Sequence, residues 1–213
     1  MSTRPARLLV CAFGPFPGVP VNPSQRAVAD LLRLRRPALG GLDIEVEILP
    51  TRWDALSRLD ALLERRVPDG VILFGVAARR RWVSVETLAV NAARALPDAA
   101  RRPPPGRRLL AGAPDALGAT MPAGPLLAAL RAGGVPAATS RDAGRYLCNA
   151  GLLHALAWAR RRRDAGGPPP AVFIHLPGRS GRPRGVSRAG MARALSALVV
   201  AFAAAVRHRR QAR

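Results

Sequence analysis

The sequence predicts a single α/β domain, a three-layer αβα sandwich around a mostly parallel, mixed sheet. Short apolar segments alternate with segments of helical periodicity along most of the 213 residues, an order typical of a sheet covered by helices on both faces. This length suits one core. Hydrophobic residues make up 49% of the chain and can fill that core, which excludes a wholly disordered protein.

Strands are predicted by short apolar runs that end at glycine, proline or a polar residue. Residues 44–49 alternate apolar with acidic side chains, so that strand has one exposed face. The predicted strands are 7–13, 44–49, 71–75, 136–140 and 171–176, and the weak alternation of 82–91 predicts one more.

Helices are predicted where apolar residues recur three and four positions apart. Ser24, which follows Asn22 and Pro23, is the predicted N-cap of the first helix. The other predicted helices span 56–66, 125–131, 148–162 and 187–207. Within the domain 1–213, residues 99–118 are rich in proline, glycine and arginine and predict an exposed loop, and 207–213 form a basic tail.

The charge is strongly unbalanced: 34 basic residues, all arginine, face 13 acidic ones, a net charge of +21. Such an excess is typical of nucleic-acid-binding proteins. Those proteins usually mix lysine with arginine, however, and here arginine accompanies abundant alanine, proline and glycine, as in a compositionally biased genome. Solvated surface arginines are therefore the favoured interpretation, and a nucleic-acid partner is disfavoured.

Two cysteines exclude a disulfide scaffold and leave open one bridge or two free thiols. No spacing of cysteines and histidines supports a zinc site. The N-terminus does not resemble a signal peptide, and the apolar stretch 195–206 is shorter than the roughly 20 residues of a membrane span. We therefore expect a soluble, cytoplasmic protein without a bound metal.

Cys148 begins a predicted helix, where unpaired N–H groups and the helix dipole favour a thiolate and can hold an oxyanion. His175 lies near the carboxyl end of a strand, where α/β sites form, and could act as its general base. Glu86 is an acid in an apolar stretch, suited to an imidazolium partner. Simple core packing or exposure would explain each residue taken singly. His154 is a weaker partner, about 120° around the helix from Cys148. Together Cys148, His175 and Glu86 predict a cysteine hydrolase.

Four segments carry a family resemblance, in register from residue 8 to about residue 178. They are Leu9–Ser24, Glu86–Asn91, Ser140–Asn149 and Phe173–Pro177. In these segments the sequence resembles pyroglutamyl-peptidase I, the pyrrolidone-carboxylate peptidase family of cysteine peptidases.

The resemblance implies a compact αβα domain that removes an N-terminal pyroglutamyl residue from peptides without a cofactor. It implies Cys148 as the nucleophile, His175 as the general acid and base, and Glu86 as the group that orients His175. It also implies a pocket for the lactam ring, and the substrate-binding residues that match are Phe13, Phe16, Thr51, Val76 and Leu96. Relatives are often oligomers, so a homo-oligomer is expected among the partners, although the sequence shows no interface signature.

Three segments depart from the family pattern. Residues 75–80 replace a Gly-Gln-Ala-Gly-Gly-Arg motif, residues 94–99 lack its arginine in register, and Gly178 with an arginine- and glycine-rich run replaces a tyrosine and a later glutamine. These changes leave open a related cysteine amidase or peptidase with another N-terminal specificity. A non-enzymatic nucleic-acid binder ranks last, since it would not need the three matched residues.

Overall fold

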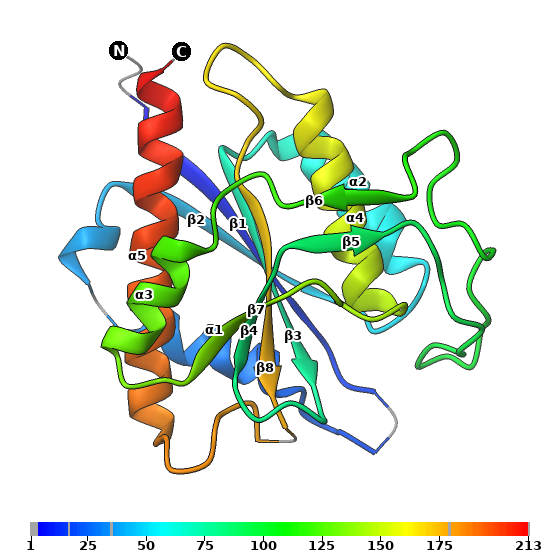
Figure 1. Ribbon diagram of the computed structural model, residues 1–213, viewed down its shortest axis with the longest axis horizontal. Coiled ribbons are helices and arrows are strands. Elements are labelled where there is room, and N and C mark those ends of the chain that lie inside the picture. The colour runs from blue at the N-terminus through cyan, green and yellow to red at the C-terminus, as the bar shows by residue number, and fades with distance from the viewer. Residues whose placement is uncertain (1–3, 17, 35, 179, 213) are drawn as a thin grey trace.

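A six-stranded sheet in the order β2-β1-β3-β8-β4-β7 forms the centre of the molecule in the computed structural model (Figure 1). The structure describes residues 4–16, 18–34, 36–178 and 180–212, so the ends of the predicted domain and tail, 1–3 and 213, lie outside it. The strands are β1 (Ala6–Phe13), β2 (Leu42–Leu49), β3 (Gly70–Ala77), β4 (Val83–Glu86), β7 (Ala137–Ser140) and β8 (Ala171–Pro177).

The sheet is mixed, as predicted. The pairs β1–β2, β1–β3, β3–β8 and β4–β7 are parallel, and only the β4–β8 pair is antiparallel. Two short strands, β5 (Leu88–Val90) and β6 (Ala116–Gly118), form a separate antiparallel pair. The register places Gly75 of β3 and Ser84 of β4 on either side of His175 in β8.

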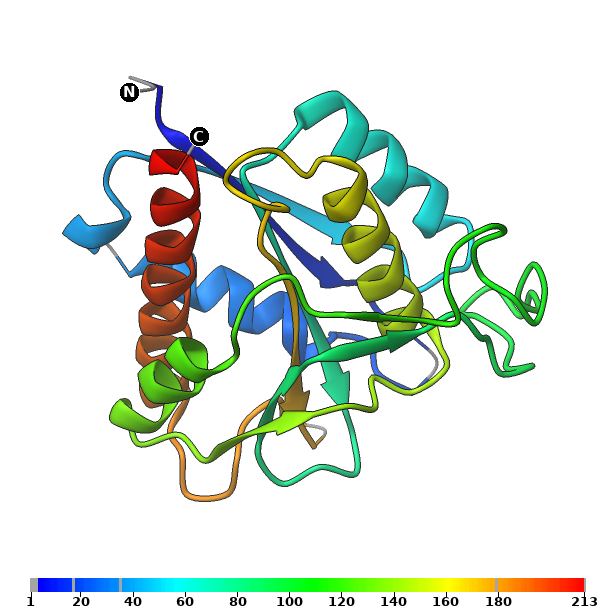
Figure 2. The ribbon, with the colours of Figure 1, turned by 45° about the horizontal axis from the view of Figure 1, so that its top comes forward.

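Helices cover both faces of the sheet, which confirms the predicted sandwich (Figures 1 and 2). Side chains of α1, α3 and α5 share one apolar core with the sheet, and side chains of α2 and α4 share the other. The α-helices are α1 (Pro23–Arg33), α2 (Ala55–Arg66), α3 (Gly124–Ala132), α4 (Leu147–Arg161) and α5 (Arg188–Gln211), and a 3₁₀ turn spans Pro37–Leu39.

The first helix begins differently from the prediction. Asn22, not Ser24, is its N-cap, and the Asn22 side chain accepts a hydrogen bond from the Ser24 backbone N–H at 3.0 Å. Pro23 occupies the first helical position, where its fixed φ suits the helix and no N–H is needed. The Ser24 hydroxyl is buried and donates to Asn22 Oδ1 instead.

The weakly alternating stretch 82–91 contains two strands rather than one. β4 joins the main sheet, β5 leaves it to pair with β6, and the chain changes partners at Thr87. β6 also closes the stretch 99–118 that was predicted as a loop.

The last helix continues to Gln211, beyond the predicted end at Arg207. Its basic last turn complements the negative end of the helix dipole. Arg209 is buried there, and its Nε donates to the Gly167 carbonyl at 2.9 Å.

Among the described residues, α5 is the one helix long and apolar enough to cross a membrane. Core helices of globular proteins can have the same length and apolar composition. The apolar residues of α5, including Leu195, Leu198 and Phe202, are buried in the core that it shares with α1, α3 and the sheet. Packing against the sheet therefore explains its composition.

Candidate active site

Strand alternation gathers three of the singled-out positions on one face of the sheet. Leu73 in β3 and Phe173 in β8 belong to the core under α2 and α4, so Gly75 and His175, two residues further along, face the same way. In β4, Val83 and Val85 face the opposite core. Glu86 therefore shares the α4 face with Gly75 and His175.

Glu86 and His175 form a buried pair. Glu86 Oε1 lies 2.7 Å from His175 Nδ1, and the two residues are 0% and 4% exposed. The carboxylate thus accepts the Nδ1 proton, which fixes the ring and leaves Nε2 for other chemistry. The prediction that Glu86 is buried with an imidazole partner is met, and exposure on the strand face is not observed.

Cys148 lies in the first turn of α4, half-buried above this pair. A Cβ added at Gly75 would stand 3.0 Å from the Cys148 sulfur, so the thiol rests directly on β3. Its sulfur is also close enough to His175 to influence the charge of the imidazole. Burial alone disfavours the charged imidazole, but the neighbouring Cys148 and Glu86 outweigh it and raise the pKa of His175 to about 9. The site thus favours an imidazolium beside the sulfur.

The start of α4 is held by its neighbours on both sides. The buried Asn149 side chain accepts from the Val90 N–H and donates to the Val90 carbonyl, both at 2.8 Å, as a further strand beside β5 would. Tyr146 packs its ring edge-on against Trp53, with centroids 5.2 Å apart, and its hydroxyl donates to the Pro97 carbonyl. These contacts fix the direction of the first turn and hence of the Cys148 side chain.

Arg80 is a further site residue that the sequence analysis did not single out. Its Nη1 donates to Glu86 Oε1, the same oxygen that holds His175, and its Nη2 donates to Ser140 Oγ at 3.0 Å and to the Asp142 carbonyl. Arg80 therefore links the buried carboxylate to the segment that leads into α4. The signal was present, since Arg80 occupies the place of the arginine that ends the family's Gly-Gln-Ala-Gly-Gly-Arg motif.

The β1–α1 and β2–α2 loops lie together beside the site. The ring of Phe13 is buried, 6.2 Å from that of Phe173, and Phe16 is half-buried. Thr51 is buried and its hydroxyl donates to the Gly14 carbonyl at 2.8 Å, which also accepts from Asn22 Nδ2 at 3.0 Å. Thr51 therefore fixes the turn that carries the two phenylalanines.

The remaining predicted pocket residues differ in orientation. Val76 follows Gly75 in β3, so strand alternation turns its side chain to the other face of the sheet and leaves its backbone beside the site. Leu96 is 44% exposed. The loop that carries Leu96 is bound to the segment preceding α4, because the Arg94 N–H donates to the Arg145 carbonyl at 2.8 Å.

Two other reactive side chains lie away from this cluster. Cys11 is fully buried in β1, and burial, with the charges of Glu47 and Glu45, raises the pKa of its thiol well above the usual range. His154 hydrogen-bonds Asp60 through Nδ1 at 2.9 Å. Both cysteines are free thiols. Across the described residues, no group of three or more histidine, cysteine and acidic side chains is arranged to hold a metal ion.

The pyroglutamyl peptidase family model matches residues 6–207 of the chain. The pyrrolidone-carboxylate peptidase of Erwinia tasmaniensis is 38% identical over 173 residues, 80% of this chain and 78% of that protein. A mutant pyrrolidone carboxyl peptidase from Pyrococcus furiosus superposes with a TM-score of 0.80 at 28% identity, over 94% of this chain and 99% of that one. The enzyme from Thermococcus litoralis gives 0.79 at 27% identity, over 93% and 94%. The chain thus belongs to the pyroglutamyl peptidase family.

Proposed function

We propose that this protein is a cysteine exopeptidase that removes an N-terminal pyroglutamyl residue from peptides through a thioacyl-enzyme intermediate. The observation that carries this proposal is the Cys148–His175–Glu86 cluster at the first turn of α4, in a chain that belongs to this family. We assign Cys148 as the nucleophile, His175 as the general acid and base, and Glu86 as the residue that orients His175.

In the first step the Cys148 thiolate attacks the pyroglutamyl carbonyl carbon. The first N–H groups of a helix have no acceptor within the helix, so those at the start of α4 can hold the oxyanion that forms. The protonated His175 then delivers its proton to the departing amine, the C–N bond breaks, and the shortened peptide leaves. The pyroglutamyl group remains on sulfur as a thioester.

In the second step a water molecule attacks the thioester while His175 takes its proton. The C–S bond breaks, pyroglutamate leaves, and Cys148 and His175 return to their starting protonation states. Glu86 holds the imidazole through Nδ1 in both steps, so the same ring nitrogen, Nε2, exchanges protons with the substrate.

The lactam ring is small, flat and uncharged, so apolar walls and a few backbone hydrogen bonds suit it. We assign Phe13 and Phe16 to those walls, with Thr51 fixing their loop. Leu96 forms an exposed flank on the side of Tyr146. Val76 contributes backbone rather than side chain, which is how this chain can lack the family's glutamine there.

The two free thiols are compatible with a reducing compartment, and we place the enzyme in the cytoplasm. Peptides with an N-terminal pyroglutamate are the proposed substrates. A homo-oligomer is compatible with the family resemblance and is tested by sedimentation of the purified chain.

The test is release of a fluorescent amine from a pyroglutamyl amide by wild type, Cys148→Ala and Cys11→Ala under reducing conditions. We expect turnover by wild type and by Cys11→Ala, and none by Cys148→Ala, because each substitution removes one thiol but only the Cys148 thiol lies beside His175. Equal activity of wild type and Cys148→Ala would overturn the proposal.

The departures from the family pattern in residues 75–80 leave open a different N-terminal specificity. Rates on prolyl, alanyl and glutaminyl amides, compared with the rate on the pyroglutamyl amide, distinguish the two specificities. A folded wild type that prefers one of these amides would support the alternative peptidase.

A further inference from the structure

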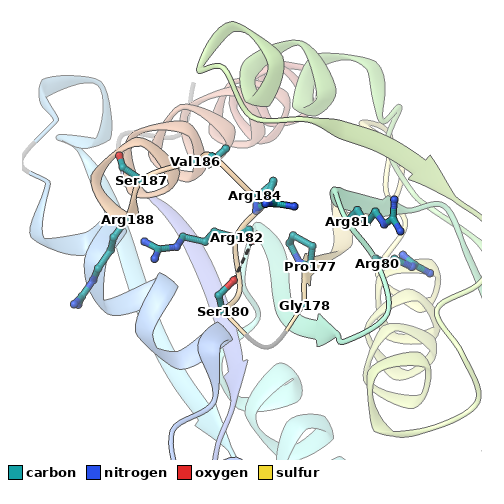
Figure 3. Close-up of a pocket in the computed structure, with 12 residues that line it drawn as sticks. Arg80, Arg81, Pro177, Gly178, Ser180, Arg182, Arg184, Val186, Ser187 and Arg188 are labelled. Atoms are coloured by element: carbon teal, nitrogen blue, oxygen red, sulfur yellow. Dashed lines mark hydrogen bonds between the residues drawn. The ribbon is translucent and has the colours of Figure 1, made fainter.

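A large cavity beside the proposed active site is lined by five arginines. Its volume is about 960 Å³, near the upper end of the about 300–1,000 Å³ typical of ligand sites. Arg80 and Arg81 come from the β3–β4 loop, and Arg182, Arg184 and Arg188 come from the β8–α5 loop. Figure 3 shows these two groups of side chains on either side of Pro177.

The charge of the cavity is largely uncompensated. Arg80 contacts Glu86, and Arg188 pairs with Asp30 at 2.6 Å. In the part of the chain that the structure describes, Arg81, Arg182 and Arg184 have no hydrogen bond or ion pair with a carboxylate, and no acidic residue lines the cavity. The positive end of the α5 dipole adds to this field, because Ser187, the N-cap of α5, also lines it.

The cavity adjoins the catalytic cluster at the end of β8. Pro177 and Gly178 line it, and Pro177 follows His175 by two positions in β8, a distance of about 7 Å along a strand. His175 donates its proton to the amine of the leaving peptide, so that peptide starts at His175. At about 3.3–3.6 Å per residue in an extended chain, a leaving peptide that runs toward Pro177 brings its second or third residue to the cavity.

The arginines also lie where this chain departs from the family pattern. Gly178 and the run that follows it replace the family's tyrosine and glutamine. A property based on Arg182 and Arg184 therefore belongs to this chain, and the family resemblance does not account for it.

We propose that the arginine cavity binds the acidic side chains of the peptide downstream of the pyroglutamyl residue, so that the enzyme selects pyroglutamyl peptides with acidic residues two or three positions after the scissile bond. This inference rests on the proposed function, since it assigns a substrate class to the same site. Guanidinium groups suit carboxylates because they donate paired, charge-assisted hydrogen bonds.

The test compares kcat/KM for three peptides: pyroglutamyl-alanine followed by two glutamates, two alanines or two lysines. At low ionic strength we expect the glutamate peptide to exceed the lysine peptide by about tenfold or more, in line with electrostatic focusing in charged clefts. Raising the salt to about 0.5 M shrinks the Debye length to a few ångströms and should remove most of the preference.

The decisive variant is Arg182→Gln/Arg184→Gln. It should reduce the glutamate preference to about twofold and leave kcat/KM for a small pyroglutamyl amide unchanged, because that substrate does not reach the cavity. Arg65→Gln/Arg207→Gln is the matched control. It removes the same charge from two exposed arginines outside the cavity, Arg65 in the last turn of α2 and Arg207 near the C-terminal end of α5.

The outcomes separate this inference from the proposed function. No turnover of the small amide by a folded wild type contradicts the proposed function itself. Turnover of the amide with equal rates for the three peptides overturns the acidic specificity alone. Equal loss of preference in the control variant also overturns it, because net charge and not the cavity would then explain selection.

A nucleic acid is the competing occupant of such a site. Binding of a labelled single-stranded oligonucleotide that disappears in Arg182→Gln/Arg184→Gln, together with unchanged peptide preference in that variant, would replace the peptide by a nucleic acid. We expect the reverse: a lost peptide preference, and weak oligonucleotide binding of equal strength in both double variants.

Discussion

Glu86 orients His175 through Nδ1 and, together with Cys148, favours the charged form of its ring. The pKa of His175 is raised to about 9 against burial by its contacts with Cys148 and Glu86. A raised pKa in the folded state stabilises the fold below the ordinary histidine value and loses that contribution as pH rises through about 9. In the proposed mechanism, the same loss of the proton ends the ability of His175 to protonate a leaving amine.

Glu86→Gln should therefore move the alkaline limb of the activity profile to lower pH, because the amide removes the negative charge that helps to raise the pKa of His175. We expect kcat to fall by about 10²–10⁴-fold, since an orienting and charge-stabilising partner is lost. The measurement is kcat/KM from pH 5 to pH 10 for both proteins. An alkaline limb at the same pH in wild type and variant would contradict this role for Glu86.

Arg80 and His175 share the Glu86 Oε1 oxygen, so Arg80 is a positioning residue. Without it, the imidazolium would be the sole charged partner of the buried carboxylate. Arg80→Gln should therefore move the alkaline limb of the activity profile to higher pH. It should also lower kcat by about tenfold, because the carboxylate and imidazole are held less firmly. Arg80→Lys should keep the limb near its wild-type position, since it retains a cation.

Arg79→Gln is the matched control for Arg80→Gln. Arg79 is the exposed neighbour in the same loop, and no hydrogen bond to its side chain is found among the described residues. A shift of the pH profile in Arg79→Gln as large as that in Arg80→Gln would show that loop charge alone, and not the Glu86 contact, sets the limb.

Among the elements, β3 decides how closely α4 approaches the sheet. A Cβ at Gly75 would stand 2.6 Å from the Phe173 ring and 3.0 Å from the Cys148 sulfur. Gly75 is therefore required by close packing: the thiol and the ring occupy the space that any side chain would fill. The sequence shows only a strand followed by glycine, which is the ordinary signal of a strand end.

Gly75→Ala should push Cys148 or Phe173 aside and lower kcat/KM by about tenfold or more, because sub-ångström displacement of a nucleophile is costly. Gly70→Ala is the control in the same strand, where the new Cβ meets Val206 and Phe202 of α5 at 2.6 and 2.7 Å. Both variants should lose thermal stability, but only Gly75→Ala should lose activity per folded molecule. Equal activity losses would contradict the special role of Gly75.

At the scale of the whole molecule, Asp69 joins both ends of the chain to the start of β3. It is 2% exposed, accepts from the Arg7 N–H at 2.9 Å, and pairs with Arg4 at 2.7 Å and Arg210 at 3.9 Å. Burial opposes its charge, but Arg4 and the Arg7 N–H outweigh burial and hold the pKa of Asp69 below its usual value. A lowered pKa contributes stability above the ordinary aspartate value, and this stability is lost as pH falls through the folded-state pKa.

Asp69→Asn should lower the free energy of unfolding at pH 7 by about 1–3 kcal/mol, as expected when a buried charged hydrogen bond is broken. The difference from wild type should shrink as the pH falls below 4, and kcat should not change. Asp115→Asn is the control: it also breaks an arginine pair, with Arg108 at 2.7 Å, but Asp115 is 92% exposed. We expect no measurable effect there. A loss as large as that of Asp69→Asn would contradict the importance of burial.

Local sequence patterns predicted the fold class and most elements, and the motifs that resemble the family predicted the proposed catalytic residues. These depend on local patterns: alternation and periodicity select strands and helices, and the motifs around Cys148, Glu86 and His175 are contiguous. Local patterns failed where the chain changes partners, at Thr87 between β4 and β5, and where Pro23 moves the cap to Asn22.

The interactions between distant segments became clear from the tertiary structure. The contact of Arg80 with Glu86, the packing of the Cys148 sulfur on Gly75 and the arginine cavity each join residues from different loops. In the sequence, the arginines of the cavity are indistinguishable from the other arginines of a chain rich in them. The electrostatic effect of an arginine depends on whether it shares a concave surface with other arginines and without carboxylates, because charges act through space and not along the chain.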